Sequence, residues 1–346
     1  MNQHKKGIAC GGQWIIDRVK CIDHYPREFS VAMISDEKWS GGGCSYNVIK
    51  NLALFDPSLP LIAVGLIGRD TDGDRILKDL EQYKNISTRF LKKTDKATSY
   101  TDVYSIRETG SRTFFHFPGA NALFSVNSVE ARQLNARIFH LGYLGILDAM
   151  DAPDEAFGSQ SARFLNDLKT LGIQTSVDLI TTDRPDFCRI VEPVLKFTDY
   201  LIINELEAGQ LTSVPVRKHR RIDKGRLLKN AETIFQKGLN ELLIIHFPEG
   251  AFLQARSGAT LYQPALQLPK EFIIGSTGAG DSFCSAVLYG LYQKWTLEET
   301  LRFAVCAGAQ NLHDLTSTGA ITSWQEIFTL YEKYPKQESV FKGRVE

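Results

Sequence analysis

Short apolar runs alternate with amphipathic stretches along most of the chain. The runs are rich in Ile, Leu and Val and lack the strict polar alternation of a half-solvated strand, which favours strands covered by helices on both faces. They lie at 61–67, 138–142, 174–178, 200–203 and 242–245. The helical patterns lie at 46–55, 74–84, 162–171, 224–238 and 281–294. This order predicts βαβ units, and therefore an α/β fold with a Rossmann-like, mainly parallel sheet flanked by helices.

Two segments, 14–39 and 98–118, interrupt this order. Both are rich in Val, Ile, Tyr, Thr and Phe, and the second contains the turn signal Thr109-Gly110-Ser111. We interpret them as additional strands, some antiparallel, that form a small β-sheet lid. The lid strands are expected to be inserted in one α/β domain at 1–335, which a tail at 336–346 follows. In such sheets, the loops at the carboxyl ends of the strands carry the ligand sites.

Composition and charge exclude several classes of protein. The 346 residues include 40 Lys and Arg and 40 Asp and Glu, so no overall charge favours binding to nucleic acid or to an anionic membrane surface. The basic run at 217–221 has no interleaved aromatic residues for stacking on a single strand. It suits a solvated insertion, or a phosphate contact at the edge of a nucleotide cleft.

The ends of the chain and its cysteines predict a compartment. The first residues lack the apolar segment of a signal peptide, and the longest apolar run, at 138–147, is too short to cross a bilayer. The six cysteines form no C-x-x-C pair, and the seven histidines are scattered. This pattern indicates free thiols in a reducing compartment rather than a zinc site. We therefore expect a cytoplasmic protein without a membrane or nucleic-acid partner.

The segment 275–281 is the most informative for chemistry. It is a glycine-rich turn that leads directly into a predicted helix, whose free N–H groups and dipole favour anionic oxygens. Gly278 and Gly280 would let the backbone approach a phosphate closely. Asp281 would stand where this anion site meets a substrate and could accept a proton from an attacking hydroxyl. The same residues also suit an ordinary capped helix.

Two further patterns are weaker when each is taken alone. Gly41-Gly42-Gly43 precedes a helix that carries Asn47 in its first turn, and an Asn side chain suits a sugar hydroxyl. The stretch 204–207 follows the predicted strand at 200–203, where a carboxylate suits a hydrated Mg²⁺. A glycine turn before a helix and a charged helix start explain both patterns without function.

Together, and in this order, the patterns resemble the ribokinase-like (PfkB) family of carbohydrate kinases. The amino-terminal signature matches Gly42-Gly43 with Asn47, and the more specific carboxyl-terminal signature matches 276–281. The resemblance covers nearly the whole chain, from Ile8 to about Ile321. The supporting matches are Gly12 with Asp17, Gly65 with Gly68, Asp70 and Gly73, Pro118 to Asn121, Asn204 with Glu207, and Gly319 with Ala320.

The resemblance implies a function, a set of ligands and a role for each matching residue. Family members transfer the γ-phosphoryl group of ATP to a hydroxymethyl group of a sugar or sugar acid, with Mg²⁺. Asp281 would be the general base, and the backbone of Gly278, Ala279 and Gly280 would form the anion hole. The residues implied to bind the sugar are Asp17, Gly42, Gly43, Asn47 and Asn121. The residues implied to bind ATP are Asn204, Glu207, Thr277, Gly278 and Gly280, with Glu207 holding Mg²⁺ through water.

The sequence departs from the family pattern at two places. An Asp commonly stands six residues before the catalytic Asp and is associated with a monovalent cation, but this chain has Gly275 there, which puts such a cation in doubt. The strand at 242–245 continues as 246–250, without the first glycine of the family's nucleotide-contacting loop and one residue short. ATP contacts in this loop are therefore expected to differ.

Several alternatives stay open at this point. A nucleoside kinase of the same family would phosphorylate the same kind of hydroxymethyl group, and a non-catalytic sugar or nucleotide sensor would explain the two departures. Arg112 keeps a phosphosugar substrate possible. Arg112, Phe114, Phe115 and His116 could shape the sugar pocket or simply fill β-strand positions. An exposed strand edge in the lid favours a homodimer through the lid.

Overall fold

The computed structural model describes residues 5–106 and 112–341. The turn predicted at 109–111 and the last part of the predicted tail, 342–346, lie outside the described residues. Among the described residues, no helix combines the length and the apolar character needed to cross a membrane.

A nine-stranded sheet forms the centre of the molecule, in the order β17-β16-β15-β12-β11-β8-β1-β4-β5. The strands from β15 to β5 run parallel, and β16, near one edge, is antiparallel to both of its neighbours, β15 and β17. Their bounds are β1 (Ile8–Gly12), β4 (Leu61–Gly68), β5 (Ile86–Thr94), β8 (Ile138–Leu144), β11 (Gln174–Leu179), β12 (Tyr200–Asn204), β15 (Leu242–Phe247), β16 (Gly250–Ala255) and β17 (Thr260–Pro264). The predicted mainly parallel sheet is confirmed.

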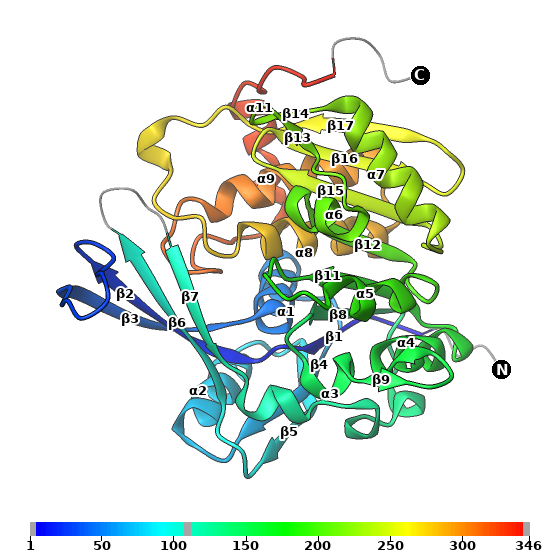
Figure 1. Ribbon diagram of the computed structural model, residues 1–346. Helices are drawn as coiled ribbons and strands as arrows, with labels where there is room; N and C mark the ends of the chain where they lie inside the picture. Colours follow the sequence, from blue (N-terminus) through cyan, green and yellow to red (C-terminus); the bar gives the residue numbers. More distant parts are fainter. Residues whose placement is uncertain (1–4, 107–111, 342–346) are drawn as a thin grey trace.

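Helices cover both faces of this sheet, and each face has its own apolar core (Figure 1). Because successive side chains of a strand point to opposite faces, Ile202 packs in one core while its neighbours Leu201 and Ile203 pack in the other. One core receives α1 (Cys44–Phe55), α2 (Thr71–Leu80), α8 (Ala279–Gln293), α9 (Leu297–Asn311), α10 (Trp324–Phe328) and α11 (Leu330–Lys333). The other receives α3 (Asp148–Asp151), α4 (Gln160–Thr170), α5 (Phe187–Leu195), α6 (Glu205–Thr212) and α7 (Lys224–Gln236).

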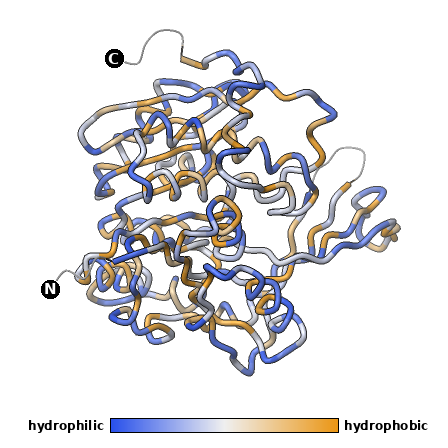
Figure 2. The backbone as a smooth tube through the Cα atoms, turned by 180° about the vertical axis from the view of Figure 1, so that it is seen from behind, coloured by the Kyte–Doolittle hydropathy of each residue, from blue (hydrophilic) through white to orange (hydrophobic). Residues whose placement is uncertain are grey.

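A separate four-stranded sheet, the lid, projects from one side of the body (Figure 1). Its strands are β3 (Ile34–Gly42), β2 (Ile15–Ile22), β6 (Ser99–Ile106) and β7 (Arg112–Phe117), in that order. The central pair β2 and β6 is parallel, and the outer pairs are antiparallel. The predicted small β-sheet lid is confirmed. Figure 2 shows that apolar and polar stretches alternate along this projecting sheet. Trp39, Phe115 and Phe117 of the lid are exposed.

The lid turns one face toward the carboxyl ends of the main strands. Asp17 of β2, Thr101 of β6 and His116 of β7 are paired across the lid and lie on this face. Two short hairpins complete the strands, β9 (Pro153–Asp154) with β10 (Gly158–Ser159) and β13 (Arg217–Lys218) with β14 (Arg221–Ile222). The position of the boundary between the domain and the tail, at 335, stays a prediction.

Candidate active site

A cavity of about 550 Å³, the main cavity, lies between the lid and the carboxyl ends of the parallel strands. The strands and the loops that follow them contribute Gln13, Tyr143, Asp178, Thr181 and Asn204. The lid contributes Asp17, Thr101, Arg112 and His116, and two helix starts contribute Gly43, Asn47, Ser276, Thr277, Gly278, Gly280 and Asp281. The structure therefore brings most of the predicted site residues together in one place.

Asp281 lies in the first turn of α8 and is 5% exposed. The Tyr143 hydroxyl donates to its Oδ1 at 2.6 Å, and Nδ2 of Asn47 donates to its Oδ2 at 2.8 Å. Burial raises the pKa of Asp281 to about 6, although both hydrogen bonds act to lower it. The carboxylate is therefore mostly ionised at neutral pH, fixed in direction and open to the main cavity.

Residues 276–281, the cradle, wrap the start of α8. The helix begins after Gly278, whose φ of 79° belongs to the left-handed region. A Cβ atom at this position would lie 2.5 Å from the Ser317 carbonyl oxygen, so only glycine fits. Helix N–H groups in a first turn have no intrahelical acceptor, although that of Ala279 donates to the Ser276 carbonyl at 3.4 Å. The cradle thus presents N–H groups and a helix dipole to an anion.

The lid reaches the cradle through Arg112. Its guanidinium donates to Oγ1 of Thr277, which joins a residue of β7 to the loop before α8. Arg112, Phe114 and His116 all line the main cavity, which is one of the two interpretations that the sequence left open, whereas Phe115 points away and is exposed. A positive charge therefore stands next to the start of α8.

Asp17 of β2 and Asn47 of α1 both line the main cavity. Burial raises the pKa of Asp17 to about 7, and the nearby Asp281 carboxylate raises it further in the same direction. Gly42 packs directly against the Asp17 carboxylate but does not itself line the cavity. The Asn47 side chain is engaged at both ends, because its Oδ1 also accepts a hydrogen bond of 2.7 Å from Ser317.

Asn121, like Gly42, is a predicted sugar ligand that is not part of the wall of the main cavity. It is fully buried and does not line the main cavity. Its side chain accepts from the Trp14 N–H at 3.4 Å and donates to the Trp14 carbonyl at 3.2 Å. Asn121 therefore holds the backbone next to the start of β2, where Ile15 and Asp17 enter the cavity.

Asn204 and Glu207 lie where β12 meets α6. The Asn204 side chain caps the helix, and Glu207 accepts from the Asn204 N–H at 2.9 Å and from Thr181 Oγ1 at 2.9 Å. Burial raises the pKa of Glu207 to about 7. Burial, with Glu207 and Asp281 nearby, also raises the pKa of Asp178, at the end of β11, well above its usual value.

Asp178, Glu207 and Asp281 form a group of buried carboxyls around the main cavity. None of the ion pairs in residues 5–106 and 112–341 involves any of them, and nearby bases such as Arg184 and Arg217 pair with other acids. Carboxylate and amide oxygens without a basic partner fit a hard divalent cation such as Mg²⁺.

A second cavity, of about 570 Å³, lies on the other side of the cradle. It shares His246, Ser276 and Gly280 with the main cavity, and its wall is largely apolar. The apolar side chains that line it include Leu266, Leu268, Phe283, Val305 and Leu312. Burial lowers the pKa of His246 to about 4, so its ring is neutral. The shortened stretch 246–250 forms a tight hairpin between β15 and β16 at this place.

Gly275 lies at the position where the family commonly has Asp. A Cβ atom there would lie 2.5 Å from the Asp314 carbonyl oxygen. The backbone at 274 and 275 also donates to the Leu312 carbonyl, at 2.7 and 3.1 Å. The chain is therefore packed too closely at this point for any side chain, a carboxylate included.

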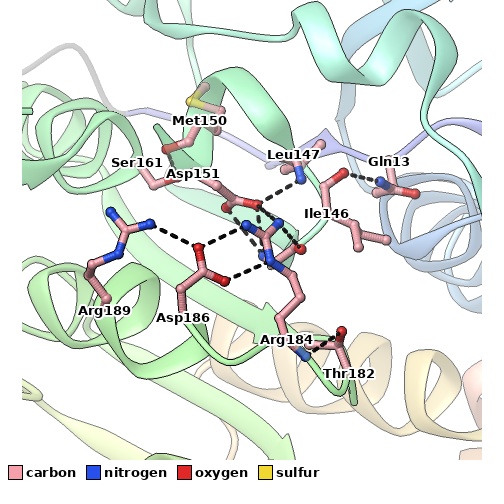
Figure 3. A network of polar contacts seen from close by, with 11 residues as sticks. Gln13, Ile146, Leu147, Met150, Asp151, Ser161, Thr182, Arg184, Asp186 and Arg189 are labelled. Carbon is pink, nitrogen blue, oxygen red and sulfur yellow. Dashed lines mark hydrogen bonds and ion pairs between the residues drawn. The ribbon is translucent and has the colours of Figure 1, made fainter. Parts of the chain in front are cut away.

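A polar network holds the rim of the main cavity on the side of β8 (Figure 3). Asp151 accepts the N–H groups of Gly145 and Leu147, and Arg184 donates to the Gly145 carbonyl at 2.8 Å. Gln13 donates to the Ile146 carbonyl at 3.0 Å, which keeps Ile146 against the cavity. Three separate parts of the chain thus hold the loop at 145–147, which follows β8.

Sequence reasoning missed Tyr143, Asp178 and Thr181 as cavity residues. Each lies at or just beyond the carboxyl end of a strand that the sequence predicted correctly, 138–142 or 174–178. The rule that parallel sheets bind ligands at these ends would have found them.

Comparison with known proteins agrees with this geometry. Residues 6–326 match the family described as pfkB family carbohydrate kinase. Probable fructokinase-7 of Arabidopsis thaliana is 23% identical over 329 residues, which are 91% of this chain and 88% of the relative. The bifunctional ribokinase/ribose-5-phosphate isomerase A of Fructilactobacillus sanfranciscensis is 22% identical over 284 residues, which are 82% of this chain. They are only 48% of that protein, so the chain matches about half of its length.

The same fold is found in Arabidopsis thaliana ribokinase complexed with ribose and ATP. The TM-score is 0.77 at 19% identity, over 94% of this chain and 99% of the ribokinase chain. The fold is therefore ribokinase-like. Because the family match extends over nearly the whole chain and its two signatures meet at one cavity, the chain belongs to the pfkB family of carbohydrate kinases.

Proposed function

We propose that the protein is an ATP-dependent kinase that transfers the γ-phosphoryl group to a hydroxymethyl group of a free sugar or sugar acid. The observation that carries the proposal is the position of Asp281. Its ionisable carboxylate is held by two hydrogen bonds, faces the main cavity and stands at the start of a helix that can bind an anion.

In this proposal, Asp281 accepts the proton of the attacking hydroxyl, and the N–H groups of the cradle stabilise charge on the transferred phosphoryl group. Asp17 and Asn47 orient the sugar through its other hydroxyls. Phosphoryl transfer depends on positioning and on charge stabilisation more than on covalent catalysis. The lid would exclude water, which otherwise competes as the acceptor.

The second cavity and the buried carboxyls suggest where ATP and Mg²⁺ bind. An apolar cavity next to the cradle suits a nucleoside, with its phosphates directed across residues 276–280 toward the main cavity. Glu207, through water, with Asp178 and Asn204 nearby, would hold Mg²⁺, whose chemistry is to neutralise charge on the phosphate oxygens. Neutral His246 and the short hairpin at 246–250 would contact the nucleotide differently from the family's glycine loop.

Three further parts of the proposal rest on single features. The packing around Gly275 supports activity that does not depend on a monovalent cation. The exposed aromatic residues of the lid support a homodimer through the lid. A cytoplasmic location stays a prediction from the sequence.

A nucleoside is the second candidate substrate. Apolar side chains of Ile15, Ile146 and Ile180 line the main cavity and could pack against a base. A purely non-catalytic sensor is less consistent with the site, because the base and the cradle are both complete. ADP release with pentoses, hexoses, keto-deoxy sugar acids and nucleosides as acceptors separates these possibilities.

The test of the proposed function is Asp281→Asn. Asparagine keeps the size of the side chain but is not a base, so kcat should fall by roughly 10²–10⁴-fold. Binding of the acceptor, followed by thermal shift, should be retained, since a bound ligand stabilises the fold by mass action. Asp167→Asn, which makes the same change at an exposed position of α4, is the matched control. Unchanged ADP release by Asp281→Asn would refute the assignment of the base.

A further inference from the structure

A cluster of sulfur, nitrogen and oxygen ligands lies directly beneath the main cavity. Cys44, His140 and Asp178 each direct one potential ligand atom to a common point, and all three atoms lie within 4.8 Å of one another. The Cys44 sulfur is 3.2 Å from His140 Nε2 and 4.0 Å from Asp178 Oδ2. The Cys284 sulfur lies 3.7 Å from the same Nε2. The proposed kinase reaction gives no role to the two thiols or to the imidazole.

These distances are close to the edges of a tetrahedral metal site. With metal–ligand bonds of 2.0–2.3 Å, the ligand atoms around zinc are about 3.3–3.8 Å apart. The distances from His140 Nε2 to the Cys44 and Cys284 sulfurs, 3.2 and 3.7 Å, lie at or near this range, and the 4.0 Å between Cys44 and Asp178 is slightly longer. The Cys284 sulfur lies outside the set of three atoms that are all within 4.8 Å of one another. Two thiols, one imidazole and one carboxyl form a donor set typical of Zn²⁺ in proteins.

The imidazole is also prepared to act as a ligand. Burial lowers the pKa of His140 to about 3, so the ring is neutral. Its other nitrogen, Nδ1, lies 3.0 Å from Ser176 Oγ, which can fix the tautomer that leaves the Nε2 lone pair directed at the two sulfurs. Such an outer hydrogen bond accompanies almost every zinc-bound histidine.

We propose that Cys44, His140 and Asp178 form a binding site for a thiophilic divalent metal ion, Zn²⁺ above all, and that the Cys284 thiol beside His140 completes it by a small movement of its side chain. Each bound thiol loses its proton to solvent as its sulfur coordinates the metal. Asp178 also lines the main cavity, which gives the ion a path from that cavity into the buried site. The spacing of these residues in the sequence gives no sign of the site, because four separate elements, α1, β8, β11 and α8, each supply one ligand.

The position of the site would give the metal a structural effect. α1 carries Asn47, β8 carries Tyr143 and α8 carries Asp281, so one ion would join the three elements that arrange the proposed base. Metal binding should therefore raise the thermal stability of the protein. The metal site itself does not rest on the proposed kinase activity.

Cobalt titration of the reduced, chelator-treated full chain tests the site, because Co²⁺ reports on the atoms that bind it. Wild type should take up one Co²⁺ with a near-ultraviolet thiolate-to-cobalt band and the intense visible bands of a tetrahedral site. Added Zn²⁺ should remove both and raise the melting temperature. Magnesium-type binding at the oxygens of Asp178 and Glu207 would give no thiolate band.

Variants assign the ligands. Cys44→Ser and Cys284→Ser should each lose the thiolate band or weaken it strongly. Cys188→Ser should keep it, because Cys188 is a half-buried cysteine on α5 whose sulfur contacts the Gln210 carbonyl instead. Ser176→Ala removes only the outer hydrogen bond and should weaken zinc affinity roughly 10–100-fold. The proposal is overturned if wild type shows no thiolate band. It is equally overturned if the band stays unchanged in Cys44→Ser or Cys284→Ser, whose folding circular dichroism checks independently.

Discussion

At the scale of single residues, the balance between burial and hydrogen bonding sets the proposed chemistry. Burial raises the pKa of Asp281 to about 6, and the hydrogen bonds from Tyr143 and Asn47 keep it from rising further. Asp17, with a pKa raised to about 7, lies close enough to influence it. Because the two carboxyls interact, the apparent pKa values in a pH–rate profile describe the titration of Asp17 and Asp281 together, not of either residue alone.

The pH dependence of kcat/KM should follow from this balance. Activity should fall as the pH decreases through about 6, because the base becomes protonated. Tyr143→Phe removes a hydrogen bond that lowers the pKa of Asp281, so the acid limb should move to higher pH. Tyr46→Phe, which removes a hydroxyl bonded to Asp79, is the matched control and should leave the limb in place. An acid limb that stays or moves to lower pH in Tyr143→Phe would contradict the role of Tyr143.

Gly278 offers a second test at this scale. Gly278→Ala and Gly172→Ala both force alanine into a left-handed backbone, with φ of 79° and 71°, at a cost of about 1–2 kcal/mol each. Only at 278 does the new Cβ meet an atom, the Ser317 carbonyl oxygen at 2.5 Å. Gly278→Ala should therefore lower the free energy of unfolding by roughly 1–3 kcal/mol more than Gly172→Ala and should also lower kcat. Chemical denaturation measures the difference, and equal losses would show that the cradle tolerates a side chain.

At the scale of elements, the sequence predicted correctly those strands and helix starts that a local pattern of residues determines. The strands at 61–67 and 200–203 are uninterrupted apolar runs, and the start of α8 follows from its glycines and its apolar stripe. The contact of Tyr143 with Asp281 has no local signal, because it depends on the order of strands in the sheet and on the packing of α8. Asn121 shows the opposite case, because it belongs to a matching motif, yet its side chain bonds to the Trp14 backbone and does not line the main cavity.

A change in the lid can show whether the lid contributes to the proposed phosphate site at the start of α8. Arg112 of β7 donates to Thr277 of the cradle, so the lid supplies a positive charge where phosphate is proposed to bind. Arg112→Gln should lower kcat/KM for ATP roughly 10–100-fold, the value of one hydrogen bond to a charged group. Lys38→Gln, on the exposed part of β3, is the control and should have no such effect. Steady-state kinetics with unchanged constants in Arg112→Gln would mean that the lid arginine does not reach the phosphates.

At the scale of the whole molecule, the face of the lid that points away from the main cavity exposes more aromatic surface than a purely solvent-exposed face normally does. Phe115 packs edge-to-face on Tyr104 and Phe117 stacks on Tyr100, yet both phenylalanines are exposed, at 51% and 40%. Exposed aromatic clusters of this kind mark contact surfaces. The edge strands of the lid also leave backbone groups free to pair with a second copy.

The proposed dimer is tested by analytical ultracentrifugation over a range of concentrations. Wild type should sediment as a dimer, and Phe115→Glu should shift the equilibrium to the monomer, because a carboxylate at the centre of an apolar contact has no compensating partner. Leu206→Glu replaces an equally exposed apolar residue on α6, outside the lid, and should leave the dimer intact. A wild-type monomer at every concentration would contradict the proposal. A Phe115→Glu variant that remains dimeric would place the interface away from the lid, and the lid would then close over the cavity of its own subunit alone.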